Sequence, residues 1–191
     1  MGKYCELKDK RVMVTGAASG IGLATAQRFA AEGAKVFIID CNKDALAKAM
    51  EENPSFAGSG VCDVSSEEDV LSVFKKMDSE LGGIDVLVSN AGISIRKDFV
   101  DISYEQWQKV ININLNGMFL CTREAARRMK AQKSGVILMT ASTNGTEGHR
   151  WYTDYNASKA GVILLTKSMA LELAPDVRVN CVCPGYVLTP M

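Results

Sequence analysis

Residues 11–22, RVMVTGAASGIG, carry the strongest structural signal in this chain. Arg11–Thr15 is short and almost entirely apolar, as expected for a β-strand that is covered on both faces. A helical pattern begins at Gly20, so Thr15–Gly22 joins a strand to a helix. Glycines there let the backbone approach a diphosphate, and the helix start offers free N–H groups and the positive end of its dipole. Taken alone, the turn is as consistent with a structural role as with phosphate binding.

The same alternation of strand and helix continues along the chain. Short segments rich in Val, Ile and Leu predict strands at Arg11–Thr15, Lys35–Asp40, Phe56–Asp63, Ile84–Ser89, Gly135–Ala141 and Val177–Cys183. The patterns between them predict helices at Gly20–Glu32, Lys43–Glu52, Ser66–Leu81, Ser103–Lys130 and Thr153–Ala174. This order is typical of an α/β protein with a doubly wound parallel sheet. The length of 191 residues predicts a single domain over residues 1–191.

Charge and hydropathy argue against several kinds of partner. Twenty-two basic residues balance twenty-two acidic ones, and the two signs are interspersed. This argues against a nucleic-acid or anionic-membrane partner. No apolar run approaches the ~18 residues of a membrane span, and the N-terminus lacks the apolar core of a signal peptide. We therefore expect a cytoplasmic protein.

The six cysteines and the single histidine indicate neither a disulfide framework nor a metal site. Five cysteines fall in or beside apolar stretches, and we expect them to be small core residues: Cys41, Cys62, Cys121, Cys181 and Cys183. Cys181 and Cys183 are too close in sequence for a usual zinc spacing. We expect no bound metal, and the lone histidine leaves little room for a protease-like triad.

An acidic residue ends the second predicted strand. Asp40 lies eighteen residues beyond Gly22, close to the ~20 residues at which a carboxylate binds the ribose hydroxyls of adenosine. A carboxylate there accepts hydrogen bonds from a 2′-hydroxyl and repels a 2′-phosphate, and Ser19 and Cys41 bring no positive charge. We therefore expect NAD rather than NADP. Asp63, after the third strand, is expected either to bind the adenine amino group or to cap a loop or helix.

Tyr155 and Lys159, one helical turn apart, indicate acid–base chemistry. Residues four apart share a helix face, so Lys159 can lie beside the Tyr155 ring. The ordinary pKa of a phenol is about 10, and lowering it to about 7 needs roughly 4 kcal/mol of preferential stabilisation of the phenolate. A cation about 4 Å away, at an effective dielectric constant near 20, supplies roughly that amount. An isolated pair of this kind is more often accidental, so the prediction depends on the surrounding motifs.

Together these motifs resemble the short-chain dehydrogenase/reductase family over essentially the whole chain. Thr15–Gly22 is similar to the family's TGxxxGxG loop, and Tyr155 and Lys159 to its YxxxK pair. The other matching motifs are Asn90-Ala91-Gly92, Asn114 in the long helix, Ser142 thirteen residues before Tyr155, and Pro184-Gly185 followed by Thr189. The resemblance implies a Rossmann fold with strand order 3-2-1-4-5-6, serving as a dinucleotide-binding and catalytic domain.

The resemblance also implies reversible hydride transfer between nicotinamide and a secondary alcohol or ketone. Tyr155 is then the general base in oxidation and the general acid in reduction, and Lys159 lowers its pKa and binds the nicotinamide ribose. Ser142 stabilises the developing alkoxide, and Asn114 holds a water that relays protons from Lys159. The residues expected to bind the cofactor are Gly16, Ser19, Gly20, Ile21, Gly22, Asp40, Asp63, Val64, Asn90, Ala91, Gly92, Tyr155, Lys159, Pro184, Gly185 and Thr189. A homodimer or homotetramer formed through the two long helices is also implied.

The stretch between Ser142 and Tyr155 is expected to rim the substrate pocket. It contains large and polar side chains at Glu147, His149, Arg150 and Trp151. They favour a small polar substrate such as a sugar, a polyol or a hydroxy acid, with Arg150 pairing with a carboxylate. A solvated loop without substrate contact is an equal alternative.

The sequence given stops at Met191, directly after the Pro-Gly motif, where members of the family usually continue. We therefore expect the family's last strand and substrate lid to be absent, in a fragment or in a shortened protein. An open pocket admits water and weakens the field around Tyr155. Two alternatives to an NAD-dependent alcohol dehydrogenase follow. One is an NAD-binding protein with a regulatory role or weak activity, and the other is an NADPH-dependent 3-ketoacyl-type reductase, against which Asp40 argues.

Overall fold

Six strands form one sheet in the computed structural model, which describes residues 4–189. In chain order they are β1 (Arg11–Thr15), β2 (Lys35–Asp40), β3 (Gly58–Val61), β4 (Val86–Ser89), β5 (Gly135–Thr140) and β6 (Val177–Val182). The order across the sheet is β3-β2-β1-β4-β5-β6, and every neighbouring pair is parallel. This confirms the predicted doubly wound sheet and its strand order. The predicted bounds of β1 and β2 are the observed ones, and those of the other four strands differ by one or two residues at their ends, where the chain leaves the sheet.

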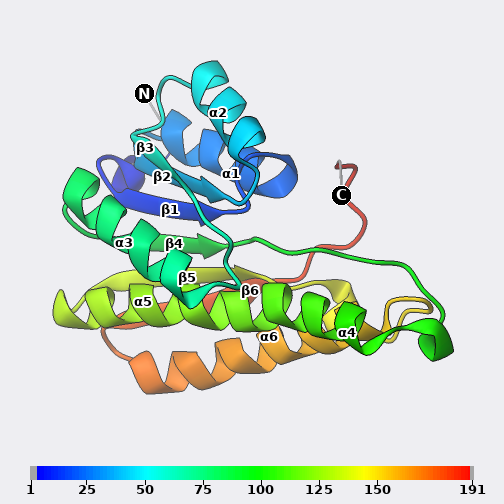
Figure 1. Cartoon of the computed structure of the whole chain (residues 1–191). Helices are drawn as coiled ribbons and strands as arrows, with labels where there is room; N and C mark the ends of the chain where they lie inside the picture. Colours follow the sequence, from blue (N-terminus) through cyan, green and yellow to red (C-terminus); the bar gives the residue numbers. More distant parts are fainter. Residues whose placement is uncertain (1–3, 190–191) are drawn as a thin grey trace.

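Helices cover the two faces of the sheet unequally (Figure 1). They are α1 (Gly20–Ala31), α2 (Lys43–Glu52), α3 (Glu67–Leu81), α4 (Tyr104–Ile111), α5 (Gly117–Ala131) and α6 (Thr153–Leu173). Alternate residues of a strand face opposite sides, so Met13 packs into the cluster under α3, α5 and α6. Its neighbours Val12 and Val14 pack into a second cluster under α1 and α2. The strands are therefore apolar at consecutive positions because both faces are buried.

The predicted helix Ser103–Lys130 is interrupted, which corrects the sequence analysis. A π-helical turn at Asn112–Asn116 separates α4 from α5, and the Gly117 N–H donates to the carbonyl of Asn112, five residues earlier. The extra residue in this turn places the buried side chain of Asn114 toward the sheet. Turns of this kind are frequent at functional sites. The 3.6-residue periodicity of the sequence does not reveal a single added residue.

The structure bears on the predicted burial of the cysteines and on the absence of a membrane span. Cys62 and Cys121 are buried as predicted, but Cys41 and Cys183 are exposed because each lies just beyond the end of a strand. In residues 4–189, no helix combines the length and the apolar character that crossing a membrane requires. The cytoplasmic location stays a prediction.

Candidate active site

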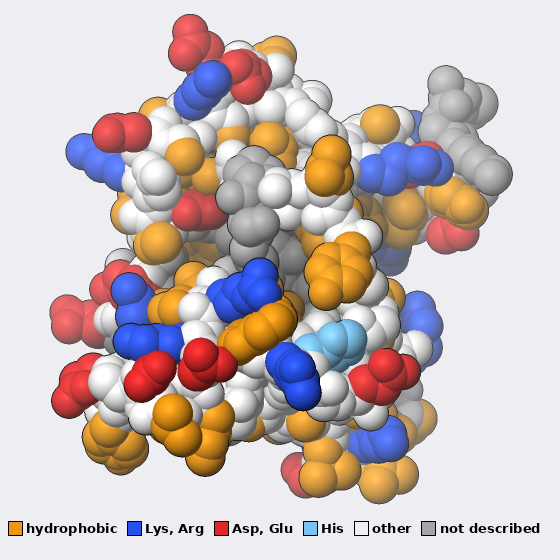
Figure 2. All heavy atoms as spheres, turned by 90° about the vertical axis from the view of Figure 1, so that its right-hand side faces the viewer, with side chains coloured by type: hydrophobic (Ala, Val, Ile, Leu, Met, Phe, Trp, Pro, Cys, Tyr) orange, Lys and Arg blue, Asp and Glu red, His pale blue; other side chains and the backbone are white. Residues whose placement is uncertain are grey.

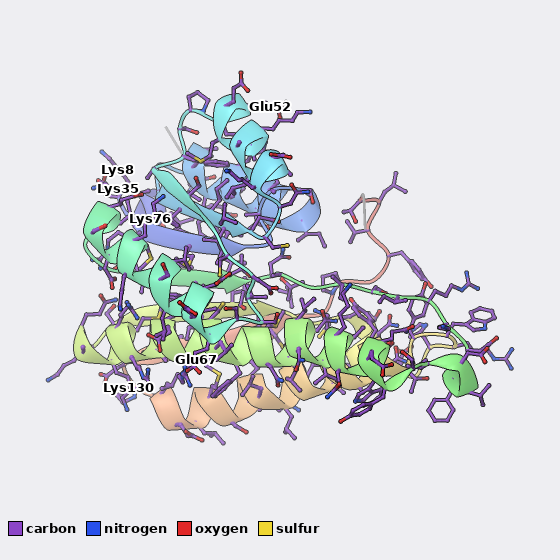
Figure 3. All side chains as sticks on the ribbon, viewed as in Figure 1. Lys8, Lys35, Glu52, Glu67, Lys76 and Lys130 are labelled. Atoms are coloured by element: carbon purple, nitrogen blue, oxygen red, sulfur yellow. The ribbon has the colours of Figure 1, made fainter. Side chains whose placement is uncertain are left out.

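A cleft of about 560 Å³ opens at the carboxyl ends of the strands, the place where doubly wound sheets bind ligands. Its lining comes from the glycine turn after β1, the ends of β2 to β5, α6 and the segment after β6. Figure 2 looks onto this end of the molecule, where apolar and charged side chains surround a hollow. Lys8, Lys35 and Lys130 lie at the opposite end (Figure 3). A second cavity, of about 640 Å³, lies along α1 and contains none of the predicted catalytic residues.

The glycine turn after β1 is held tightly against the end of β4. The hydroxyl of Thr15 accepts hydrogen bonds from the backbone N–H groups of Asn90 and Ala91, both at 2.9 Å. Gly16 has a φ of +61°, and a Cβ there would lie 2.8 Å from the Cα of Ala91. A Cβ on Gly22 would collide with the Gly16 carbonyl. Gly22 does not line the cleft, so its smallness serves the packing of the turn rather than direct contact with a ligand.

The start of α1 fits a diphosphate. Ser19, Gly20 and Ile21 line the cleft, and the Ser19 side chain makes no capping hydrogen bond to the helix. The first N–H groups of a helix lack partners within it, and α1 has no acidic residue in its first turn to compete for them. Glycine at position 20, with a φ of +54°, keeps the entrance to these groups open. The turn therefore has the shape and charge that a dinucleotide cofactor requires.

Two carboxylates lie in the cleft at the ends of β2 and β3. Asp40 accepts one hydrogen bond on each oxygen, from the N–H of Ala18 at 3.1 Å and the N–H of Asn42 at 3.0 Å. Each oxygen retains a lone pair for a further donor. Asp63 accepts from the backbone and the hydroxyl of Ser65, at 2.9 and 2.7 Å. Asp63 therefore closes a loop, as one of its two predicted roles requires, and also lines the cleft.

Ser142, Tyr155 and Lys159 lie together on what we call the floor of the cleft. Lys159 is 3% exposed, and its Nζ lies 5.5 Å from the centre of the Tyr155 ring. The Nζ donates to the carbonyl of Thr140 at 2.7 Å. The Ser142 hydroxyl accepts from the N–H of Asn144 at 3.2 Å, and its own proton has two long contacts, to the Asn144 Oδ1 at 3.4 Å and the Pro184 carbonyl at 3.5 Å. These three predicted catalytic residues thus form one cluster, assembled from the segment after β5 and from α6, in which Ser142 and Lys159 are buried and Tyr155 is half-buried.

The electrostatics of the floor differ from the prediction. Burial raises the pKa of Tyr155 above that of an ordinary phenol, and a hydrogen bond with Ser142 offsets part of the rise. Burial also lowers the pKa of Lys159 to about 8. The protein alone therefore does not lower the pKa of Tyr155 toward 7, because the cost of burying a phenolate exceeds what the hydrogen bond with Ser142 returns.

Asn114 lies behind the floor and does not line the cleft. Its amide oxygen accepts from the N–H of Ile93 at 2.8 Å, and its amide nitrogen donates to the Ile93 carbonyl at 2.9 Å. The same nitrogen donates to the hydroxyl of Ser158 at 3.1 Å. The side chain therefore clamps the segment after β4 to α6. These contacts give Asn114 a positioning role, and the water relay through this residue stays a prediction.

The other predicted cofactor residues lie along the cleft. Val64 follows β3, and Asn90, Ala91 and Gly92 follow β4. A Cβ on Gly92 would lie 3.2 Å from the Asn114 Oδ1 and 3.5 Å from the Lys159 Nζ. Pro184, Gly185 and Thr189 line the opposite wall, where Thr189 lies beside Gly20.

The four predicted substrate residues lie outside the lining of the cleft. None of Glu147, His149, Arg150 and Trp151 lines it. Their loop instead folds onto its surroundings, because the His149 carbonyl accepts from the Asn156 amide at 2.9 Å and the Trp151 carbonyl accepts from the Lys97 N–H, also at 2.9 Å.

Two residues that the sequence analysis missed line the cleft in their place. Tyr152 packs edge-on against Tyr155, with ring centres 6.4 Å apart. Arg96 follows the Asn-Ala-Gly motif, and its guanidinium lies 4.0 Å from the centre of the Trp151 ring. We call Arg96 and Trp151 the rim. The one sequence signal for Arg96 was its position four residues after Gly92, close to a motif expected to bind the cofactor. No helical or strand period identified it as a cleft residue.

A parallel sheet of this order, with its cleft at the carboxyl ends, defines a dinucleotide-binding α/β protein. The chain belongs to the short-chain dehydrogenase family of oxidoreductases, because its residues 10–191 match the family model described as short chain dehydrogenase.

Relatives of different specificity lie at similar distances. The 3-oxoacyl-(acyl-carrier-protein) reductase FabG of Thermotoga maritima is 43% identical over 189 residues, which cover 97% of this chain and 77% of the relative. The NADP-dependent (R)-specific alcohol dehydrogenase of Lentilactobacillus kefiri is 39% identical, with 97% of this chain and 76% of the relative covered. The crystal structure of an NAD+-bound xylitol dehydrogenase superposes with a TM-score of 0.92 at 38% identity, and covers 95% of this chain and 72% of that one.

Proposed function

We propose that this chain transfers a hydride between NAD and a secondary alcohol or ketone, with Tyr155 as the general acid and base. The observation that carries the proposal is the cluster of Ser142, Tyr155 and the buried Lys159 in the same cleft as the open start of α1. Proton transfer at one end of that cleft and diphosphate binding at the other are the two requirements of this reaction.

The floor residues divide the work as follows. In oxidation Tyr155 acts as the phenolate and takes the proton of the alcohol hydroxyl, and in reduction it acts as the phenol and gives its proton to the carbonyl oxygen. Ser142 exchanges its long hydrogen bonds to Asn144 and Pro184 for one to the same oxygen, to which it donates as negative charge develops. Lys159, held by Thr140, stabilises the phenolate from below. When bound, NAD supplies the hydride acceptor and a positively charged ring.

Replacing the phenol tests the proposal. Tyr155→Phe should lower turnover by about 10²–10⁴-fold, the usual contribution of a general acid or base, and leave NAD binding within about twofold. Turnover is followed by NADH absorbance with a panel of alcohols, and binding by calorimetry. Tyr104→Phe is the matched control, because Tyr104 is an exposed tyrosine outside the cleft.

The same assay separates an enzyme from a binding protein. NAD affinity without NADH formation by the parent chain would favour the regulatory or weakly active alternative. Full turnover by Tyr155→Phe would refute the role of the phenol.

We propose NAD rather than NADP as the cofactor. The support is the Asp40 carboxylate in the cleft, with two lone pairs free for ribose hydroxyls. Its charge repels a 2′-phosphate. The relatives point both ways, since one is an NADP-dependent alcohol dehydrogenase and another an NAD+-bound xylitol dehydrogenase. The latter also supports a small polar substrate, such as a polyol, over a large apolar one.

A second candidate activity is the reduction of a 3-ketoacyl thioester. The 43% identity to a 3-oxoacyl-(acyl-carrier-protein) reductase favours it. A side-by-side assay with an acetoacetyl thioester and NADPH, against polyols and hydroxy acids with NAD, distinguishes the two. Higher kcat/KM for the thioester with NADPH would select the reductase.

We propose a homo-oligomer formed through α5 and α6. Large apolar side chains are exposed on both helices: Phe119 on α5, and Leu164 and Leu171 on α6. A helix that is apolar on its outer side as well as its inner side needs a cover. Light scattering should show a dimer or tetramer, and Leu164→Glu should shift it toward the monomer.

A further inference from the structure

The segment from Ile93 to Lys97 lies between two fixed points beside the floor. Asn114 holds both backbone groups of Ile93, and the Trp151 carbonyl holds the N–H of Lys97 at 2.9 Å. Four residues span at most about 14 Å of chain. Arg96, near the second fixed point, is therefore confined to the neighbourhood of the floor even though its side chain is exposed.

The charges in the lining are divided between its two ends. Only four of the lining residues within 4–189 carry a formal charge, namely Asp40, Asp63, Arg96 and Lys159. The two carboxylates follow β2 and β3, whereas Arg96 follows β4. Strands β2 and β4 lie on either side of β1, so their ends are about 10 Å apart. The end of the cleft near Tyr155 is thus positively charged, and the adenosine end is negative.

Lys159 is not available to an anionic group of a substrate, because it is buried and donates to Thr140. Arg96 is available. Within residues 4–189 it forms no ion pair with any acidic side chain, and its one described partner is the face of Trp151. Stacking on an aromatic ring orients a guanidinium and leaves its N–H groups, which lie in the ring plane, free to bind an anion.

Trp151 is held in an unusual conformation while it provides this face. Its φ is +68°, a region that is unfavourable for a bulky residue. Its carbonyl is bound to the very segment that carries Arg96. Backbone and side chain of Trp151 therefore both position Arg96.

We propose that Arg96, positioned by Trp151, binds an anionic oxygen group of the substrate, so that the substrate class is a ketone or alcohol bearing a carboxylate or a phosphate. The inference rests on the proposed function and deepens it. It moves the anion-binding role from Arg150, which the sequence favours, to an arginine of the cleft lining. A guanidinium binds either anion in a bidentate manner, so the two anions are compared experimentally.

Matched pairs of small ketones test the inference by binding. Acetoacetate is compared with methyl acetoacetate, and dihydroxyacetone phosphate with dihydroxyacetone, by calorimetry with the protein alone and with NADH present. We expect at least one anion to bind about tenfold or more tightly than its neutral partner. Arg96→Ala should reduce that affinity by about 10- to 100-fold, as loss of a charge-assisted hydrogen bond does. The neutral ketones should change less than about twofold.

Three variants sharpen the test. Arg96→Lys should retain part of the affinity because it keeps the charge but not the bidentate geometry. Trp151→Ala should reduce anion affinity by about 2- to 5-fold, the contribution of an exposed cation–π contact, and Trp151→Phe should restore most of it. Arg150→Ala should leave the anion preference intact.

Three results would overturn the inference. Either neither anion binds more tightly than its neutral partner, or Arg96→Ala weakens the binding of charged and neutral ligands equally. The third is that Arg150→Ala, and not Arg96→Ala, loses the preference for the anion. Turnover is measured separately with NADH. Selective anion binding without NADH oxidation would refute the proposed function and leave the anion site standing. Equal turnover of charged and neutral ketones would support a dehydrogenase and refute the anion site.

Discussion

The floor and the rim of the cleft are held in different ways. Lys159 is 3% exposed and donates a 2.7 Å hydrogen bond to the backbone. Trp151 is 40% exposed, and the side chains of the rim meet in one stacked contact beside one backbone hydrogen bond. A buried group with a fixed partner leaves little freedom for change, and an exposed stacked pair leaves much. Under the proposed function, the floor therefore carries the chemistry of the reaction. The rim can vary more, and we infer that it selects the substrate.

The largest effect is expected on the floor. Lys159→Met should lower kcat by about 10²–10³-fold, because it removes the charge that stabilises the phenolate. The fold should remain intact, since methionine fills a similar volume without a buried charge. If the floor were as tolerant as the rim, the loss would be only a few-fold.

The same variant should also differ from the parent in how its free energy of unfolding depends on pH. The pKa of Lys159 in the folded chain, about 8, lies below its ordinary value of 10.5, so between these values the unfolded chain binds more protons. The contribution of Lys159 to the free energy of unfolding of the parent should therefore rise with pH above about 8, by up to roughly 3 kcal/mol in all. Lys159→Met should lack this rise. Urea unfolding of both proteins from pH 7 to 9.5 measures the difference, and parallel curves would contradict the buried-amine account.

Removing the support behind the floor should have the next largest effect. Asn114→Ala leaves two backbone groups of Ile93 without partners, and we expect about 2–4 kcal/mol of lost stability and a roughly 10- to 100-fold lower kcat. Asn112→Ala is the control, because Asn112 lies in the same π-helical turn but is exposed. Urea midpoints and kcat are measured together. Equal effects of the two substitutions would show that the turn itself, not the clamp, is what matters.

The floor was largely predictable from the sequence because its signals are local. Tyr155 and Lys159 are four residues apart on one helix, and the conformation of Gly16 follows from the turn in which it lies. The clamp by Asn114 was not predictable in the same way. It depends on a π-helical turn and on contacts with residues more than twenty positions away. The spacing of apolar residues along a helix contains no information about either.

The rim was not predictable for a related reason. Arg96 meets Trp151, 55 residues further along the chain, and neither residue belongs to a regular element. The size and polarity of residues 147–151 drew attention to this loop, but they did not indicate that its carbonyls bind neighbouring segments. The pKa of Tyr155 was missed because distance to a cation can be guessed from spacing, whereas burial cannot.

A smaller effect is expected at the adenosine end of the cleft. Asp40→Asn keeps the shape of the side chain and removes its charge, so the ratio of kcat/KM for NAD over NADP should fall about tenfold. Asp44→Asn is the control, because Asp44 is an exposed acidic residue in the first turn of α2. Steady-state kinetics with both cofactors give the ratio. An unchanged ratio would mean that repulsion by Asp40 does not select the cofactor.

The smallest effect separates the two roles of Trp151 at the rim. Its φ of +68° costs a residue with a side chain about 1–2 kcal/mol, and costs glycine nothing comparable. Trp151→Ala and Trp151→Gly both lose the stacked ring, so they should weaken anion binding equally. Trp151→Gly should nevertheless be more stable in urea by about 0.5–1 kcal/mol, because glycine relieves the backbone. If the alanine variant proved equally stable, its loop must have relaxed away from this conformation. The segment that carries Arg96 would then have lost its second fixed point, and the alanine variant would also bind anions more weakly than the glycine variant.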